Sequence, residues 1–188
     1  MTNVPAYLQD ASVLLKQDGF VTGNIWYHGT SSALLDSIQT HGLIRSGDKA
    51  LRQAIKKTMA TIGDNSYAET TEPVFLTPSK ELAYYWAAQT VHNRSVRFEG
   101  KEEPVVIAMT LPDDLLAKVQ PDVGAAALLM VQGNDYLEFL AEVYTANGLT
   151  LEEPDPLRAN RDDFLRLLGM AYLDQDVDAR YLQVVKSE

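Results

Sequence analysis

The spacing of apolar residues along the chain alternates between a helical period and short continuous runs. The helical period predicts helices at Val4–Gln17, Ser31–Thr40 and Ala50–Ile62, a helix that begins at the capping residue Thr77, and mostly helical structure over 125–147. Short apolar runs predict strands at Asn24–His28, Pro73–Leu76, Pro104–Leu111 and Tyr181–Lys186. The stretch Asp163–Leu173 fits a helix or a strand. Because these elements follow no regular βαβ alternation, we expect an α+β fold.

The length of the chain favours one domain, since 188 residues bury a sizeable core. We expect a single domain over 1–188, with an N-terminal helix within 1–20 and a helical and loop insertion over 125–160. The absence of cysteine excludes disulfides and cysteine nucleophiles. His41 and His92 lack the spacing of metal ligands, so we predict no metal site. We find neither a secretory leader nor an apolar run near the roughly 20 residues of a membrane span. A cytoplasmic protein with no membrane partner is therefore expected.

The formal net charge of −10 bears on the choice of partner. An acidic chain lacks the concentrated Lys and Arg that hold nucleic-acid phosphates. A local group of cations is nevertheless present at Arg45, Lys49, Arg52, Lys56 and Lys57. We interpret this group as a solvated face, and nucleic acid as a disfavoured partner.

The tripeptide His28-Gly29-Thr30 carries the first sign of chemistry, because it closes a strand and opens a helix. Gly29 allows close approach of the backbone to a ligand, and Thr30 or Ser31 is suited to cap the following helix. One imidazole, a pair of backbone polar groups and a hydroxyl are thereby gathered around one small pocket.

A second segment makes this pattern more specific. Tyr27–Ser31, followed by a helix that ends at Gly42-Leu43, and Val74–Lys80, which leads into Ala83–Ala87, resemble the NAD-dependent ADP-ribosyltransferases. The match is closest to the branch of the diphtheria-type toxins and the poly(ADP-ribose) polymerases. That family has a His on its first core strand, an aromatic residue on the helix after the third strand, and often a Glu on a later strand. The resemblance implies a split, mostly antiparallel sheet with surrounding helices, and NAD as the substrate.

The resemblance also implies roles for the first motif. His28 would bond the adenine-side ribose, the backbone of Gly29 would hold the nicotinamide amide, and Thr30 or Ser31 would lie near a ribose. Arg45 would meet the diphosphate, since guanidinium binds phosphate in a bidentate way; a surface arginine is an equal interpretation.

The second motif supplies the aromatic that stacks on nicotinamide. Ungapped counting places this residue at Trp86, while other alignments give Tyr85 or Tyr84. We favour Trp86, because it shares the inward stripe of the helix, and rank Tyr85 second. Phe75 would be a second wall of the same pocket, and Ala83 the small residue beside the amide.

The glutamate is the missing element. Asp176–Leu182 resembles the closing strand of the family, and counting back from it places the glutamate near Leu168. Some family members with an aliphatic residue there transfer single ADP-ribose units or are inactive. Alternatively, Asn134–Glu138 forms the later strand and Asp135 or Glu138 is the acid, although the spacing of this stretch is helical.

We therefore expect transfer of single ADP-ribose units from NAD to a macromolecular acceptor, with protein preferred, as in a toxin or effector. A catalytically inactive NAD or ADP-ribose-binding module and a nucleic-acid ADP-ribosyltransferase are the alternatives. An RNA 2′-phosphotransferase ranks low, because its Arg-His-His-Arg set is not assembled by the three histidines of this chain.

Overall fold

The computed structural model describes residues 3–61, 71–122 and 124–187, and its fold class is α+β with mostly antiparallel sheets. The first sheet has three strands, with β5 (Pro104–Thr110) between β3 (Ile25–Ser31) and β8 (Leu182–Val184). In its register Gly29 lies opposite Val106 and His28 opposite Ile107. The strand that ends in the His-Gly-Thr motif is therefore at one edge of this sheet.

A second sheet of three short strands begins beside this edge. Its central strand β7 (Ala171–Leu173) lies between β4 (Val74–Leu76) and β6 (Gln120–Pro121). In the described chain one isolated bridge, Tyr27 to Thr77, connects β3 to the end of β4. The two sheets separate on one side of this bridge, which leaves the edge of β3 open beyond Tyr27.

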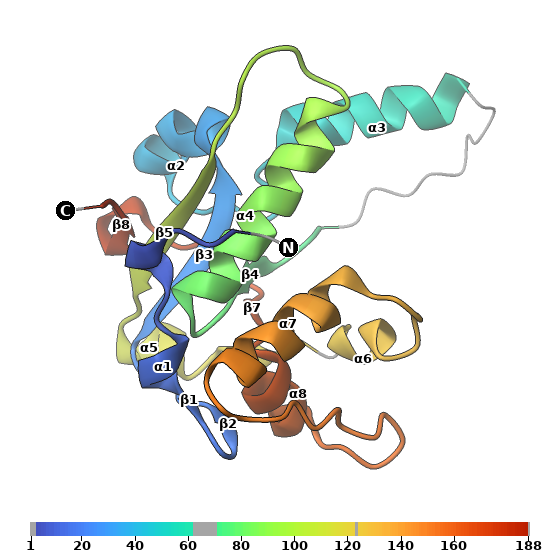
Figure 1. Cartoon of the computed structure of the whole chain (residues 1–188). Coiled ribbons are helices and arrows are strands. Elements are labelled where there is room, and N and C mark those ends of the chain that lie inside the picture. Colours follow the sequence, from blue (N-terminus) through green and yellow to red (C-terminus); the bar gives the residue numbers. More distant parts are fainter. Residues whose placement is uncertain (1–2, 62–70, 123, 188) are drawn as a thin grey trace.

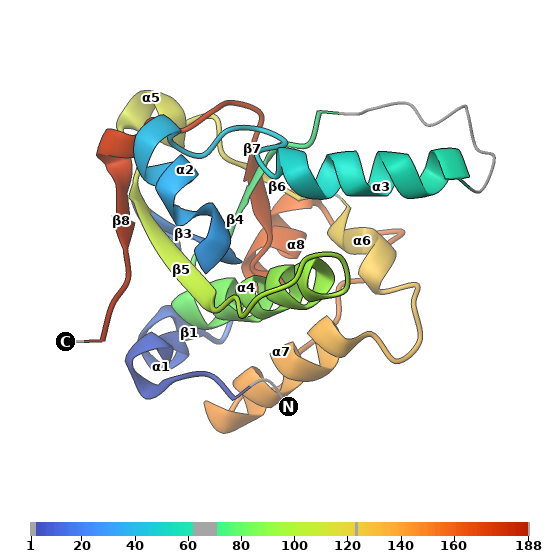
Figure 2. The same cartoon turned by 90° about the horizontal axis from the view of Figure 1, so that it is seen from above.

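Two hydrophobic cores cover the two faces of the sheets. The first core joins the N-terminal segment to α4 (Lys80–Ser95), α7 (Asp135–Ala146) and α8 (Arg161–Leu168). The second core lies under α2 (Leu35–His41) on the opposite face. Figure 2 shows this order of layers, with α2 above the strands and α4 and α7 below them. Because α7 contributes five buried side chains to the first core, the 125–160 segment is integral to the fold.

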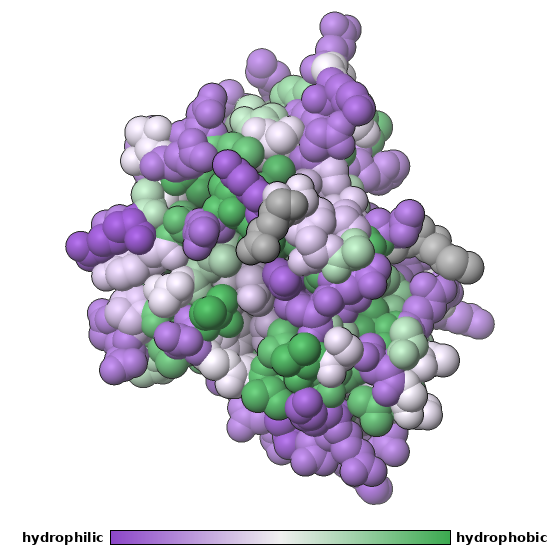
Figure 3. All heavy atoms as spheres, turned by 60° about the vertical axis from the view of Figure 1, so that its left-hand side comes forward, coloured by the Kyte–Doolittle hydropathy of each residue, from purple (hydrophilic) through white to green (hydrophobic). Residues whose placement is uncertain are grey.

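The remaining elements are short or lie at the periphery. They are the 3₁₀ turns Ala6–Leu8, Ser32–Leu34 and Ala179–Tyr181, the hairpin β1 (Leu15–Lys16) and β2 (Gly19–Phe20), and the helices α1 (Ala11–Leu14), α3 (Lys49–Thr61), α5 (Asp113–Leu116) and α6 (Ala125–Leu128). Ile62, the expected last residue of the third helix, lies outside the described residues. Figure 1 shows α6, α7 and α8 gathered on one side and α3 extending away from the body. Hydrophilic side chains cover most of the face seen in Figure 3, with apolar areas between them. In the described part of the chain no helix combines the length and apolarity needed to cross a membrane.

The helix expected at Val4–Gln17 is a correction, because the structure breaks it into a 3₁₀ turn, α1 and a β-hairpin. Asp10 explains the break, since its carboxylate accepts hydrogen bonds from the Ser79 hydroxyl at 2.6 Å and the Lys80 amide at 2.9 Å. The start of α4 thereby fixes the chain between the 3₁₀ turn and α1. Gly19, with φ at 103°, then closes the hairpin.

The start of α4 also differs from the expectation. Ser79 caps it, because the Ser79 hydroxyl accepts from the Glu81 amide at 3.2 Å. Thr77 lies two residues earlier, where its hydroxyl accepts from the Ser79 amide. The capping chemistry expected at Thr77 is therefore present, two residues later along the chain.

The ambiguous stretch Asp163–Leu173 contains both a helix and a strand. An Asn160 and Asp163 capping box begins α8, and Gly169 ends it in the left-handed conformation at φ 64°. The hydroxyl of Tyr136 donates to the Leu168 carbonyl, which satisfies a buried acceptor at the end of α8. Two residues after Gly169 the chain enters β7.

A buried ionic network connects α4 to the first sheet. Arg94 is 6% exposed and donates to Glu102 at 2.7 Å and to Asp48, while the Ser31 hydroxyl also donates to Glu102. The hydrogen bond from Arg94 is the main cause that lowers the pKa of Glu102. This network fixes the loop before α3 against the end of α4.

Arg94→Lys tests this network. A lysine keeps the charge but lacks the guanidinium fork that serves two carboxylates. One half-buried carboxylate loses its partner, so we expect the free energy of unfolding to fall by about 1–3 kcal/mol. Urea denaturation measures the change, with Arg180→Lys at an exposed pair as the control. Equal stability of the two variants would contradict a structural role for the network.

Candidate functional site

A cleft with two lobes opens where the two sheets separate. The first lobe, of about 370 Å³, lies between β3, the end of β4, α4 and the start of β7. The second lobe, of about 290 Å³, lies between β3, β4, α2 and α3. Four residues line both lobes, namely His28, Gly29, Phe75 and Thr90. The His-Gly pair of β3 therefore stands at the junction of two adjoining cavities.

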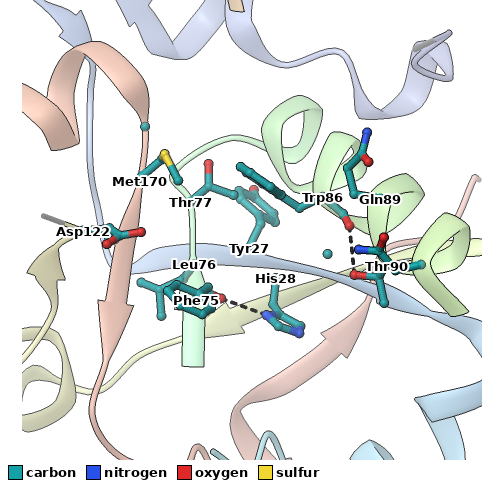
Figure 4. Close-up of a pocket in the computed structure, with 14 residues that line it drawn as sticks. Tyr27, His28, Phe75, Leu76, Thr77, Trp86, Gln89, Thr90, Asp122 and Met170 are labelled. Carbon is teal, nitrogen blue, oxygen red and sulfur yellow. Dashed lines mark hydrogen bonds between the residues drawn. The ribbon is translucent and has the colours of Figure 1, made fainter. Parts of the chain in front are cut away.

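His28 presents a neutral imidazole at this junction. Its Nδ1 lies 2.8 Å from the Phe75 carbonyl oxygen, and a carbonyl only accepts, so Nδ1 carries the proton (Figure 4). Burial is the main cause that lowers the pKa of His28, which favours the uncharged ring at neutral pH. Nε2 is left as an acceptor, suited to a hydroxyl group of a ligand.

Gly29 turns its own amide and carbonyl toward the open edge of β3. The amide and carbonyl of one strand residue point to the same side, and the sides alternate along the strand. Tyr27 exchanges two hydrogen bonds of 2.9 Å with Thr77, so the odd-numbered residues of β3 face away from β5. The carbonyl of Val106, opposite Gly29, accepts from Val185 instead. One donor and one acceptor of Gly29 therefore face the gap between the sheets.

Close packing explains why this position is a glycine. A Cβ at Gly29 would lie 1.9 Å from the Ala83 carbonyl oxygen and 2.5 Å from the Ala87 amide nitrogen. The backbone of α4 thus lies directly against β3. The sequence predicts that a ligand approaches the backbone at Gly29. In the structure, helix α4 makes this close approach.

Aromatic side chains form the walls of the first lobe. Trp86 points into it from α4, and the Tyr27 ring lies beside it (Figure 4). The indole also packs on Tyr136, with ring centroids 4.9 Å apart, which supports its orientation. Phe75 is 46% exposed at the edge shared with the second lobe, although the run around it predicts a buried strand. The lobe is suited to hold a flat ring.

Asp122 brings a carboxylate to the first lobe, and the sequence analysis missed it. Of the described residues that line this lobe, Asp122 is the one with an acidic side chain. It follows β6, where its amide donates to the Met170 carbonyl at 3.0 Å and its Oδ1 accepts from the Gly124 amide at 2.8 Å. In Figure 4 it lies across the lobe from Trp86. A strand of two residues has no readable period, so no signal in the sequence marks this position.

The positions considered for the glutamate carry no carboxylate into the cleft. Leu168 is fully buried at the end of α8, because Gly169 ends that helix before the strand begins. The residues that follow it, Gly169, Met170 and Ala171, line the first lobe instead. Asp135 and Glu138 lie in the first turn of α7 and outside both lobes, so the helical interpretation of that stretch is confirmed.

Two other expected residues lie away from the cleft. Arg45 pairs with Asp174 at 3.0 Å and with Asp176 at 3.4 Å, which commits its guanidinium to two carboxylates. Ser31 is buried in the network with Glu102. Thr30, by contrast, lines the second lobe, so it is the hydroxyl residue of the motif that reaches a cavity.

Ala83 and the tyrosines beside Trp86 also belong to the body of the fold. Ala83 is fully buried beneath Gly29. Tyr85 stacks on Phe139 in the first core, with ring centroids 5.0 Å apart. Tyr84 lines neither lobe. Of the three aromatic positions considered, Trp86 is the one that the structure brings to the cleft.

The cationic side chain that the structure brings to the second lobe is Arg52 of α3. Among the described residues, no group of three or more His, Asp or Glu side chains is arranged to hold a metal ion. Comparison with family models, with curated proteins and with solved structures gives no match for this chain.

Proposed function

We propose that this chain is a mono-ADP-ribosyltransferase that transfers ADP-ribose from NAD to a macromolecular acceptor. The single observation that carries the proposal is the position of His28 and Gly29 at the junction of two lobes. A dinucleotide has two ring systems joined through riboses and a diphosphate, so it needs adjoining cavities with polar groups between them. The two three-stranded sheets that separate at Thr77 support an ADP-ribosyltransferase-type core.

We infer one orientation of the donor from the groups that line the two lobes. Nicotinamide occupies the first lobe against Trp86, where its carboxamide accepts from the Gly29 amide and donates to the Gly29 carbonyl. Nε2 of His28 accepts a hydrogen bond from a ribose hydroxyl. The adenosine half extends into the second lobe past Thr30, where Arg52 of α3 also lines the cavity.

The reaction breaks the bond between the ribose C1′ and the nicotinamide nitrogen. Nicotinamide leaves with the bonding electrons, and positive charge develops on the ribose, as in glycoside cleavage. The Asp122 carboxylate stabilises that charge from the first lobe. A nucleophilic atom of the acceptor then bonds to C1′ and releases its proton to solvent.

A catalytically inactive NAD-binding module is the second candidate. One observation favours it. Where β7 opens onto the first lobe the chain has Ala171, which carries no carboxylate. The two candidates share the donor site and differ in whether the C1′–N bond breaks.

Calorimetry with NAD and chromatography of released nicotinamide test both candidates. We expect wild type to bind NAD and release nicotinamide, and His28→Ala to bind about tenfold more weakly, because one hydrogen bond to ribose is lost. His41→Ala is the control, since His41 is exposed at the end of α2. Binding of NAD without release of nicotinamide would favour the inactive NAD-binding module. A wild type that does not bind NAD would refute the donor site.

A further inference from the structure

Helix α3 is positively charged, although the chain as a whole is acidic. Its 13 residues include Lys49, Arg52, Lys56 and Lys57 and no acidic residue, within a chain of net charge −10. The acid just before the helix, Asp48, is paired with Arg94. The helix is therefore a local site of positive potential beside the cleft.

The fold orients this charge toward solvent. Leu51 and Ile55 line the second lobe, so the apolar side of α3 faces the cleft. Each residue turns a helix by about 100°, which places Lys49, Lys56 and Lys57 on the opposite side. All three are exposed, and none forms an ion pair with another described residue. Figures 1 and 2 show α3 extending away from the body of the molecule.

The chemistry of this surface selects one class of partner. Protein interfaces are depleted in lysine and depend on aromatic and apolar anchors, which the three lysines do not provide. Binding at a membrane surface needs a free apolar side, and that side of α3 faces the second lobe. A row of lysines without acids matches the phosphates of a nucleic acid.

We propose that Lys49, Lys56 and Lys57 bind the phosphate backbone of a nucleic acid, which is the acceptor of ADP-ribose. This inference rests on the proposed function. From Lys49 to Lys57 the helix rises about 12 Å, and phosphates along one strand of a duplex follow at about 3.4 Å of helix axis. Three lysines therefore span about three to four phosphates. Because the apolar side of α3 lines the second lobe, a strand held on its outer side lies one helix diameter, roughly 10 Å, from the cleft.

The test measures binding and transfer separately. Fluorescence anisotropy with labelled single-stranded RNA, single-stranded DNA and duplex DNA is recorded for wild type and for Lys56→Glu/Lys57→Glu. Three phosphate contacts on duplex DNA predict that affinity falls about 40-fold between 50 and 200 mM salt, and about fourfold if one contact remains. Lys16→Glu/Lys186→Glu is the control, because it makes the same change of charge at exposed positions elsewhere.

Incubation with NAD labelled in its adenylate part then shows whether the label enters the nucleic acid. We expect binding and transfer by wild type and by the control, and loss of both in the α3 variant. The release of nicotinamide by that variant, measured without nucleic acid so that water takes the place of the acceptor, should be unchanged. Equal binding by both variants, or no binding by wild type, would overturn the inference and leave the donor site standing. Label that enters acidic proteins but not nucleic acid would also overturn it. Salt-dependent binding without nicotinamide release would instead refute the proposed transferase activity, while nucleic-acid binding by α3 would stand.

Discussion

Gly29→Ala is expected to prevent this chain from forming its native structure. A Cβ at this position would lie 1.9 Å from the Ala83 carbonyl oxygen, and the contacted atoms belong to the backbone of α4. Backbone in the middle of a helix does not move away as a flexible side chain does, so α4 would have to separate from β3. We expect the free energy of unfolding to fall by about 4 kcal/mol or more, a large part of the usual 5–15 kcal/mol of a domain.

Thermal unfolding followed by circular dichroism checks this expectation. Gly23→Ala is the matched control, because a Cβ at Gly23 meets nothing within 4 Å. The two variants separate two roles for Gly29. If the glycine serves only approach to a ligand, Gly29→Ala folds with the stability of wild type and loses only NAD affinity. That outcome would contradict the packing that the structure describes.

The sequence predicted the elements whose own residues determine them. The strand through His28, which the structure extends to Ser31, the strand Val74–Leu76 and the position of Trp86 at the cleft follow from local apolar spacing. The first core and the cleft lie on the side of α4 that carries this spacing. This spacing selected Trp86, which lines the cleft, although Tyr85 is the more deeply buried of the two in the first core.

Elements fixed by distant partners were not predictable in this way. Asp10 caps α4 across 69 or more residues of sequence, and this contact replaces the expected N-terminal helix. Arg45 is drawn to Asp174 and Asp176 rather than to the cleft. Charge and hydrogen bonding between distant segments leave no periodic pattern in a single sequence.

The carboxylate of the first lobe was not predictable, because its identification depends both on where a helix ends and on a distant segment of the chain. Counting back from Val177 ended at Leu168, but the helix persists to that residue and the strand starts at Ala171. The acid that does reach the lobe comes from beside β6, about fifty positions earlier in the chain. A carboxylate next to the donor was a chemical expectation, and its identity required the structure.

Asp122→Asn is expected to slow nicotinamide release by about 100- to 1000-fold, the usual effect of removing one preorganised electrostatic group. The amide is nearly the same size as the carboxylate, and its Oδ1 still accepts from the Gly124 amide. The turn into α6 is therefore retained while the negative charge is lost. Because the charge on the ribose develops in the transition state, the affinity for NAD should change little.

Single-turnover release of nicotinamide measures the rate, and calorimetry measures the affinity. Glu138→Gln is the matched control, since it removes one exposed carboxylate that lies outside both lobes. We expect this control to release nicotinamide at the wild-type rate. A carboxylate that serves only the turn before α6 predicts the same rate for Asp122→Asn. Such a result would show that the chain cleaves NAD without help from the acid in the first lobe, and the charge on the ribose would then have to be stabilised by groups of the acceptor.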